Sequence, residues 1–178
     1  AYTDDGLMTR ITDRAGATST FTYNDDGRLI RDEAPEGSGW RLTREDRKNG
    51  YAVSMTSGAG RERTFALERP ADGTRVYTNT APDGTVTTRM HKDSGVTVIE
   101  RPNGIRIQTD ETADPRFGMT TPYTNRVVTT TPGGLERIVE RERSATVADG
   151  APATEPDRLA RSTTVNGRTT ETVFDGTA

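Results

Sequence analysis

The sequence predicts an all-β protein in which repeated β-hairpins form a twisted, curved antiparallel sheet. Glycine-containing turn signals recur at intervals of about 8 to 14 residues between positions 26 and 104. The segments between them alternate β-branched and polar residues, a period of two that buries one face of a strand and wets the other. No segment shows the period of an amphipathic helix. Short strands at this spacing are typical of an antiparallel meander.

The turns are predicted first, because Asn–Gly and Asp–Gly pairs supply the positive φ angles that tight hairpin turns require. The turn signals are Asp26-Gly27, Glu36-Gly37, Asn49-Gly50, Gly58 to Gly60, Asp72-Gly73, Asp83-Gly84, Ser94-Gly95 and Asn103-Gly104. Strands are expected between them, most clearly over residues 19–23, 74–78, 85–88 and 96–100. Longer hairpins are expected downstream, pairing 125–131 with 135–147 and 159–165 with 168–174.

Two segments interrupt this regular spacing. Residues 113–123 contain two prolines without alternation, and residues 148–157 are rich in proline, alanine and acids, so both are predicted to be irregular loops. Either loop is a conceivable subdomain boundary, but we expect a single module over residues 1–178. Because both ends of the sequence lie inside repeat-like segments, this module is expected to be a fragment of a larger protein.

An internal repeat stands near the N-terminus. Tyr2, Asp4 and Gly6 recur 21 positions later as Tyr23, Asp25 and Gly27, and Arg28 and Leu29 follow the second copy. A period of this size indicates an array of supersecondary units, each too small to bury its apolar face alone. Such arrays form walls and platforms more often than catalytic sites, so the repeat favours a structural function.

The composition predicts a thin core. Leu, Ile, Val and Phe together account for 27 of 178 residues, whereas Thr alone accounts for 32. A chain this poor in large apolar residues is disordered when its net charge is high, but here the net charge is −3 and threonine favours strands. There is no cysteine, so disulfides do not stabilise the fold, and no apolar run of about 20 residues would insert into a membrane.

Ionisable residues show no catalytic pattern. His91 is the single histidine, and no Ser-His-Asp arrangement around it has independent support in the sequence. Next to Lys92 and Asp93, it is expected to be an exposed residue at the end of a strand. The pairs Asp4-Asp5 and Asp25-Asp26 could bind a cation or act as an acid–base dyad, but an Asp before Gly more often begins a turn and accepts a local backbone hydrogen bond. We predict that the chain is not an enzyme and has no catalytic, cofactor-binding or metal-binding residue.

Arginine accounts for 22 of the 24 basic residues, and the acidic residues number 27. Arginine is preferred where a planar fork pairs with carboxylates or lies over aromatic rings, so we expect cross-strand ion pairs on the solvated face. The sequence pI of about 5.3 argues against nucleic-acid binding. Trp40, Tyr51 and Tyr123 lie outside the repeat positions. They either fill the thin core or, if exposed, stack on sugars.

The two N-terminal copies resemble the YD-repeat, or Rhs-repeat, family of bacterial Rhs and teneurin-like shell proteins. Segments 114–122, 127–135 and 165–175 also resemble stretches that recur in large bacterial Rhs proteins. Asp114-Pro115 resembles the site at which toxin-type members cut off their C-terminal cargo. Phe117 is inserted here, Met119 replaces the leucine and strands are predicted beyond it, so no cleavage role is expected.

The resemblance implies a structural wall segment of a spiral shell, which either encapsulates a C-terminal effector or forms a cell-surface scaffold. It implies flanking repeats of the same parent chain as partners, together with an enclosed effector domain or cell-surface glycans. It also implies a secreted or cell-surface location. A carbohydrate-binding adhesin that uses Trp40, Tyr51 and Tyr123 is the alternative.

Overall fold

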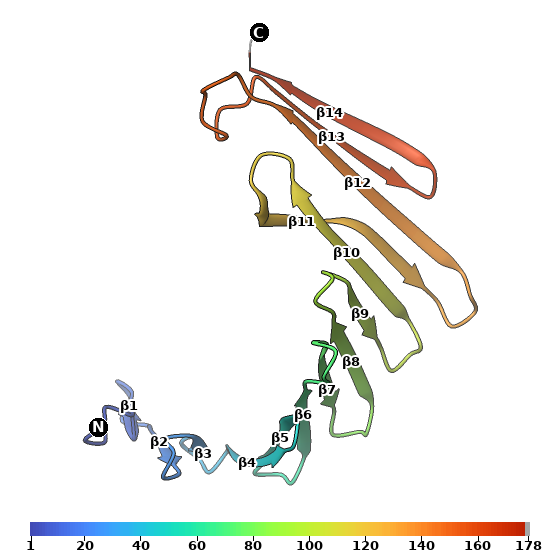
Figure 1. Ribbon diagram of the computed structural model, residues 1–178. Helices are drawn as coiled ribbons and strands as arrows, with labels where there is room; N and C mark the ends of the chain where they lie inside the picture. Colours follow the sequence, from blue (N-terminus) through green and yellow to red (C-terminus); the bar gives the residue numbers. More distant parts are fainter. Residues whose placement is uncertain (177–178) are drawn as a thin grey trace. The chain divides into compact units, whose positions relative to one another are not determined.

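In the computed structural model, residues 1–176 can be described, and they consist of β-strands and turns with no helix. The chain divides into two compact units, Ala1–Thr87 and Thr88–Ala178. The first unit contains β1 (Arg10–Thr12), β2 (Thr18–Tyr23), β3 (Leu29–Glu33), β4 (Gly39–Arg47), β5 (Gly50–Ser57), β6 (Glu62–Glu68) and β7 (Arg75–Thr80). β8 (Val86–His91) begins at the boundary, and β9 (Thr97–Glu100), β10 (Arg106–Asp114), β11 (Gly118–Thr130), β12 (Glu136–Thr146), β13 (Arg158–Val165) and β14 (Arg168–Asp175) follow it (Figure 1).

Within each unit, every strand pairs antiparallel with its neighbours in the sequence. β1 to β7 run in chain order in the first unit, and β8 to β14 run in chain order in the second. The predicted all-β fold of successive antiparallel hairpins is therefore confirmed. No helix in the described part of the chain is long and apolar enough to cross a membrane.

One five-residue turn geometry connects most of the strands. The first residue donates its N–H to the carbonyl of the fifth, and the fourth residue, a glycine with positive φ, donates to the carbonyl of the first. In the turn over residues 24–28, for example, these two distances are both 2.9 Å and Gly27 has a φ of 72°. The same two hydrogen bonds occur over residues 3–7, 13–17, 34–38, 57–61, 81–85, 92–96, 101–105 and 131–135. In the 34–38 turn Glu36 also has a positive φ, of 65°. The glycine spacing in the sequence reflects this requirement, because only glycine adopts a positive φ without strain.

Two hairpins use shorter turns. Asn166 and Gly167 have φ angles of 46° and 85° between the paired residues Val165 and Arg168, which matches the tight turn expected of Asn–Gly. At the other, Arg47 pairs with Gly50 across Lys48 and Asn49. Gly50 itself is a strand residue, and a Cβ there would lie 1.8 Å from the Leu67 carbonyl oxygen. This glycine is needed because two backbones approach closely, and not because of a turn.

The register of β4 to β7 separates two chemically different faces. Residues directly opposite each other on paired strands lie on the same face. One face, which we call the apolar face, carries Trp40, Leu42, Tyr51, Val53, Met55, Phe65, Leu67 and Tyr77, together with Arg44, Asp46, Ser57, Arg63 and Asn79. The opposite face carries Thr43, Ala52, Ser54, Thr56, Thr64, Ala66, Thr78 and Thr80, together with Arg41, Glu45, Arg47, Gly50, Glu62, Glu68 and Val76. No second layer covers the apolar face within the described residues of this unit, and Phe65 remains 38% exposed.

The core is thin, as the composition predicted. The buried apolar residues of the described chain are Ala52, Leu67, Val98, Val128, Val139 and Ala160. They lie on strands that pair with another strand on each side, and these neighbours shield them. In the second unit, Val98 and Val128 lie opposite the same residue, Gln108, from β9 and β11. Burial therefore comes from cross-strand neighbours on one sheet rather than from packing between layers.

The two segments predicted as loops differ from each other in the structure. Residues 147–157 lie outside the strands, between β12 and β13. Over 113–123, by contrast, only residues 115–117 lie between strands, and the remainder belongs to β10 and β11. The irregularity of that sequence takes the form of two register shifts, between Asp110 and Glu111 and between Thr112 and Asp114.

Candidate functional site

The repeat signature forms a turn that contacts the preceding copy. The Tyr23 hydroxyl donates a 2.9 Å hydrogen bond to the carbonyl of Met8, and a Cβ on Gly27 would lie 3.5 Å from the Leu7 side chain. Tyr2, the equivalent of Tyr23, pairs only through an isolated bridge with Met8 and is 68% exposed. The signature therefore joins one hairpin to the next, which gives the 21-residue spacing a structural meaning.

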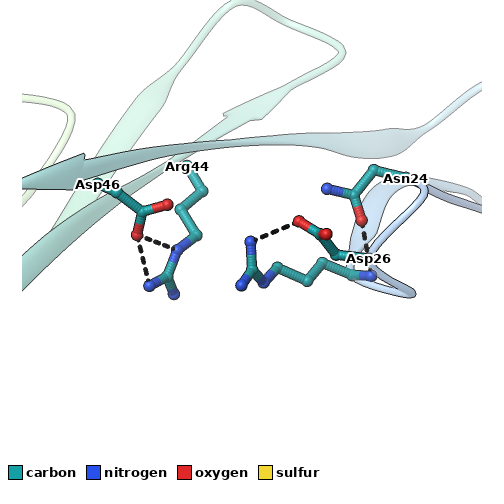
Figure 2. Close-up of polar contacts among 5 residues, drawn as sticks. Asn24, Asp26, Arg44 and Asp46 are labelled. Carbon is teal, nitrogen blue, oxygen red and sulfur yellow. Dashed lines mark hydrogen bonds and ion pairs between the residues drawn. The ribbon is translucent and has the colours of Figure 1, made fainter.

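Asp26, the aspartate before Gly27, does not accept the local backbone hydrogen bond that the sequence predicted. Asn24 Oδ1, and not an aspartate, accepts the hydrogen bond from the Arg28 N–H at 2.9 Å, and Asp26 instead pairs with the Arg28 guanidinium at 2.9 Å (Figure 2). Asp72 and Asp83 do accept a backbone hydrogen bond from the residue two positions later. The predicted local role of aspartate thus applies to other turns. Asp4 and Asp25 share their turns with Gly6 and Gly27, both at positive φ.

A wedge opens in the first unit where β3 and β4 separate. Their pairing covers only Arg31 with Arg41, Asp32 with Trp40 and Glu33 with Gly39. β4 remains paired with β5 as far as Arg47, so residues 42–47 have a strand partner on one side only. We call this region the β3–β4 wedge. It contains a hollow of about 620 Å³ whose lining includes Leu29, Ile30, Leu42 and Val53.

Charged side chains from β4 and from the turn before β3 surround this hollow. Arg44 contacts Oδ1 of Asp46 through Nε at 2.8 Å and Nη2 at 2.7 Å (Figure 2). The Arg44 guanidinium also lies 3.8 Å from the centre of the Tyr51 ring. The hydrogen bond from Arg44 lowers the pKa of Asp46, and the charge of Arg28 lowers it further. The same hydrogen bond raises the pKa of Arg44. Each ion pair joins residues two apart on one strand or turn, so neither of them links β3 to β4.

A second wedge, in the other unit, is closed by its own side chains. Residues 126–130 of β11 pair with residues 136–140 of β12, while residues 141–146 of β12 pair only with β13. We call this region the β11–β12 wedge. Here Asp114, at the end of β10, is 4% exposed and contacts Arg143 of β12 at 3.2 Å and Arg116 at 3.4 Å. Arg143 also lies over the Tyr123 ring, 4.3 Å from its centre.

The electrostatics of Asp114 follow from these contacts. Burial raises the pKa of this carboxyl, but the Arg116 N–H, the Arg143 hydrogen bond and the charge of Arg116 together outweigh burial, so the pKa lies below its ordinary value. Asp114 therefore stays ionised and links β10 to β12. The sequence had singled out Asp114-Pro115 only as a rejected cleavage site. Nothing in the local sequence indicates a partner 29 positions away.

The three candidate ligand aromatics are divided between the units, with Trp40 and Tyr51 in the first and Tyr123 in the second. Trp40 and Tyr51 lie on the same face of the first unit, but they are opposite Ser57 and Asp46 respectively, about 20 Å apart along the strands. Arg44 covers Tyr51 and Arg143 covers Tyr123, so an arginine already occupies one face of each ring. Trp40 is 40% exposed and therefore does not fill the core. It borders an open hollow of about 320 Å³ that also includes Arg41, Ser57 and Gly58.

The predicted ion pairs are present in two forms. Arg126 lies between strands as expected, 3.7 Å from Asp110 and 3.6 Å from Glu140. Others, such as Arg28 with Asp26, join residues on the same strand or turn. His91 Nδ1 lies 2.9 Å from Thr97 Oγ1. Within residues 1–176, no group of three or more His, Asp or Glu side chains is placed to hold a metal ion.

These features define a β-hairpin repeat protein in which a recurrent turn geometry, rather than a layered core, organises the chain. The Teneurin YD-shell family matches residues 1–174, and the chain belongs to this family. The resemblance to YD-repeat shell proteins is thereby confirmed, and membership supports a structural role in a shell. No curated protein matches the sequence.

Proposed function

We propose that the chain is a non-catalytic wall segment of a YD shell whose apolar face lies against an enclosed polypeptide effector. The observation that carries this proposal is the unlike character of the two faces of β4 to β7. One face holds the aromatic residues Trp40, Phe65 and Tyr77, each more than a third exposed, whereas the other holds mainly threonine, serine, alanine and charged residues. An uncovered apolar surface of this kind marks an interaction site.

The proposal assigns a different environment to each face. A polypeptide held inside a shell exposes apolar groups that aromatic and aliphatic side chains can contact, because burying such surface is favourable. The opposite face makes its own hydrogen bonds, such as Ser54 Oγ with Thr64 Oγ1 at 3.2 Å, and its charged residues, such as Arg41 and Glu62, are solvated. Flanking repeats of the same parent chain would complete the wall. The proposal includes a secreted or cell-surface location. A cell-surface scaffold without cargo is the other form that such a wall could take.

Protease protection in the full polypeptide that contains this chain tests the idea. The variant Phe65→Thr/Tyr77→Thr changes the apolar face, and Thr64→Val/Thr78→Val changes the neighbouring positions on the opposite face. We expect the first variant to make an enclosed segment sensitive to protease and the second to leave it protected. Equal protection in both variants, with folding verified by circular dichroism, would contradict enclosure by the apolar face.

Carbohydrate binding is a second candidate because Trp40 is exposed beside an open hollow. A planar indole with polar neighbours such as Arg41 and Ser57 suits a sugar ring, which stacks by its apolar face. This reading uses Trp40 alone, since arginines cover Tyr51 and Tyr123.

A glycan array followed by titration separates the two candidates. If the chain is an adhesin, Trp40→Ala should abolish a saturable glycan signal at unchanged melting temperature, while Phe65→Ala should retain it. If the chain is a shell wall, the glycan signal should be absent from the parent chain and both variants.

A further inference from the structure

The β3–β4 wedge exposes a strand edge inside the sheet. Beyond Arg41, β4 has no partner on its β3 side, although β5 pairs with it as far as Arg47. In a strand, alternate residues direct their N–H and C=O groups to opposite sides, so half of the backbone groups of residues 42–47 point into the wedge. Another extended backbone satisfies a row of such groups more completely than a small ligand can. This edge is about 20 Å long.

The hollow beside this edge has room and an apolar lining. Its volume of about 620 Å³ is within the range of ligand-binding clefts. Leu29 and Ile30 contribute from β3, and Leu42 and Val53 contribute from β4 and β5. An aliphatic side chain directed inward from an added strand would contact these four residues.

The aspartate partners of the arginines at the hollow can be replaced by a carboxylate of another chain. The side chains of Arg28 and Arg44 are 49% and 31% exposed, and each pairs with an aspartate on its own strand or turn. Exposed pairs of this kind contribute little to stability. Arg28 reaches Asp26 through Nη1, whereas a guanidinium fork can bind a carboxylate through two nitrogens. The two arginines line one hollow together with their partners Asp26 and Asp46, so an incoming carboxylate that binds both arginines displaces the two aspartates from them.

We propose that the β3–β4 wedge is a docking groove for an extended segment of another polypeptide chain. The segment adds to the free edge of β4 as a short strand, places an aliphatic side chain on Leu42 and Val53, and places an acidic side chain two residues along against Arg28 and Arg44. This spacing follows from the strand period of two. The proposal does not depend on effector enclosure, because the groove lies within one unit of the isolated chain.

The other unit shows what a closed wedge looks like. In the β11–β12 wedge, Arg143 crosses to Asp114 and stacks on Tyr123, so the chain's own groups occupy the space. In the β3–β4 wedge both ion pairs stay on their own side. No ion pair of the chain crosses the β3–β4 wedge among the described residues, so its space stays available to another chain.

A fluorescently labelled, end-blocked peptide Thr-Glu-Thr-Val-Thr tests the proposal by anisotropy with the 178-residue chain. We expect saturable binding that weakens about ten-fold in Arg28→Gln/Arg44→Gln, as for the loss of charge-assisted hydrogen bonds. Arg106→Gln/Arg126→Gln removes the same charge from exposed arginines in the other unit and should leave binding unchanged. A peptide with Lys in place of Glu should bind about ten-fold more weakly, and one with Pro in place of the central Thr should not bind.

Amide hydrogen exchange locates the bound peptide. Residues 42–47 should exchange more slowly in the complex, and residues 168–175 of β14 should not change. Binding that is equal in both double variants, or protection at β14 instead of β4, would overturn the proposal. So would protection of residues 42–47 by self-association of the chain without peptide, because a second copy would then be the occupant. Arg28→Lys/Arg44→Lys keeps the charge without the fork and should also bind more weakly, which retains the test if the Gln variant does not fold.

Discussion

The β3–β4 wedge and the β11–β12 wedge form in the same way, but side chains close only the second of them. At each, a long strand continues after its neighbour turns away, at residues 42–47 of β4 and at residues 141–146 of β12. In the β11–β12 wedge a buried aspartate attracts arginines from the β10–β11 turn and from β12. In the β3–β4 wedge each arginine binds an aspartate two residues away and the centre stays open. The placement of the carboxylate, and not the number of charges, decides whether the strands are tied together.

The strongest test of this comparison is Asp114→Asn. The substitution leaves Arg116 and Arg143 without a carboxylate in a site where Asp114 is 4% exposed. We expect a loss of about 3 kcal/mol, the lower end of values for broken buried pairs, because Arg143 is partly exposed. Urea unfolding followed by circular dichroism measures the loss, and hydrogen exchange shows whether it lies in the second unit.

The matched substitution in the open wedge is Asp46→Asn. Its carboxylate pairs with Arg44 at an exposed position, where solvent screens the interaction. We expect a much smaller change than for Asp114→Asn. Equal losses for the two variants would show that the ion pairs do not distinguish the wedges.

Burial provides the next largest contrast. Leu67 is 6% exposed on the apolar face, whereas Phe65, two residues away on the same face, is 38% exposed. Leu67→Ala should lower the free energy of unfolding by about 2 kcal/mol, and Phe65→Ala should cost less although it removes a larger side chain. Trp40 fluorescence reports unfolding of the first unit, since Trp40 is the single tryptophan. A larger loss for Phe65→Ala would indicate that another surface covers this face.

The glycine of the recurrent turn gives a graded prediction. Gly104 has a φ of 77°, and a Cβ there would lie 2.9 Å from Pro132 Cγ. Gly134 has a φ of 80° with nothing within 4 Å. Alanine at Gly134 should cost about 1 kcal/mol from backbone strain alone, and alanine at Gly104 should cost more. Melting temperatures of the two variants make the comparison, and equal values would mean that the Pro132 side chain moves aside.

A turn substitution and acid unfolding have the smallest expected effects. Asn24→Ala removes the acceptor of the Arg28 N–H and should cost about 1 kcal/mol, more than Asp26→Ala, which removes an exposed ion pair.

The lowered pKa of Asp114 stabilises the fold at all pH values above the ordinary carboxyl pKa, and this stability is lost as the pH falls through the lowered value. Below about pH 4, Asp114→Asn should therefore approach the parent chain in stability. A constant difference down to pH 2 would contradict this assignment.

The fold could be predicted where the controlling interactions are local. Glycines at positions such as 27, 84 and 104 reveal the turns because the five-residue geometry requires positive φ at that residue. Strand alternation then identifies residues 74–78 and 96–100, and the register divides the two faces. The Asn49-Gly50 signal located a hairpin correctly, although Gly50 is required by its approach to Leu67 and not by a turn.

The features that depend on distant partners could not be predicted. Asp114 and Arg143 are 29 residues apart, and the register shifts of β10 and β11 that bring them together have no local signature. The same limitation applies to Trp40, because exposure depends on whether anything covers a face. The hollow of the β3–β4 wedge depends on the point at which pairing stops, which the alternation of β4 does not reveal.

The pairing of each strand with its immediate neighbours in the sequence also has a consequence for how the chain acquires its structure. Hairpins such as β4–β5 close over loops of a few residues, so little chain entropy is lost before contacts form. Structure can then grow strand by strand from any hairpin, as in other linear arrays. A pulling force applied to one end should reverse this order and detach strands one at a time. A closed wedge would act as a stop along that path, because Asp114 and Arg143 hold β10 and β12 together across β11.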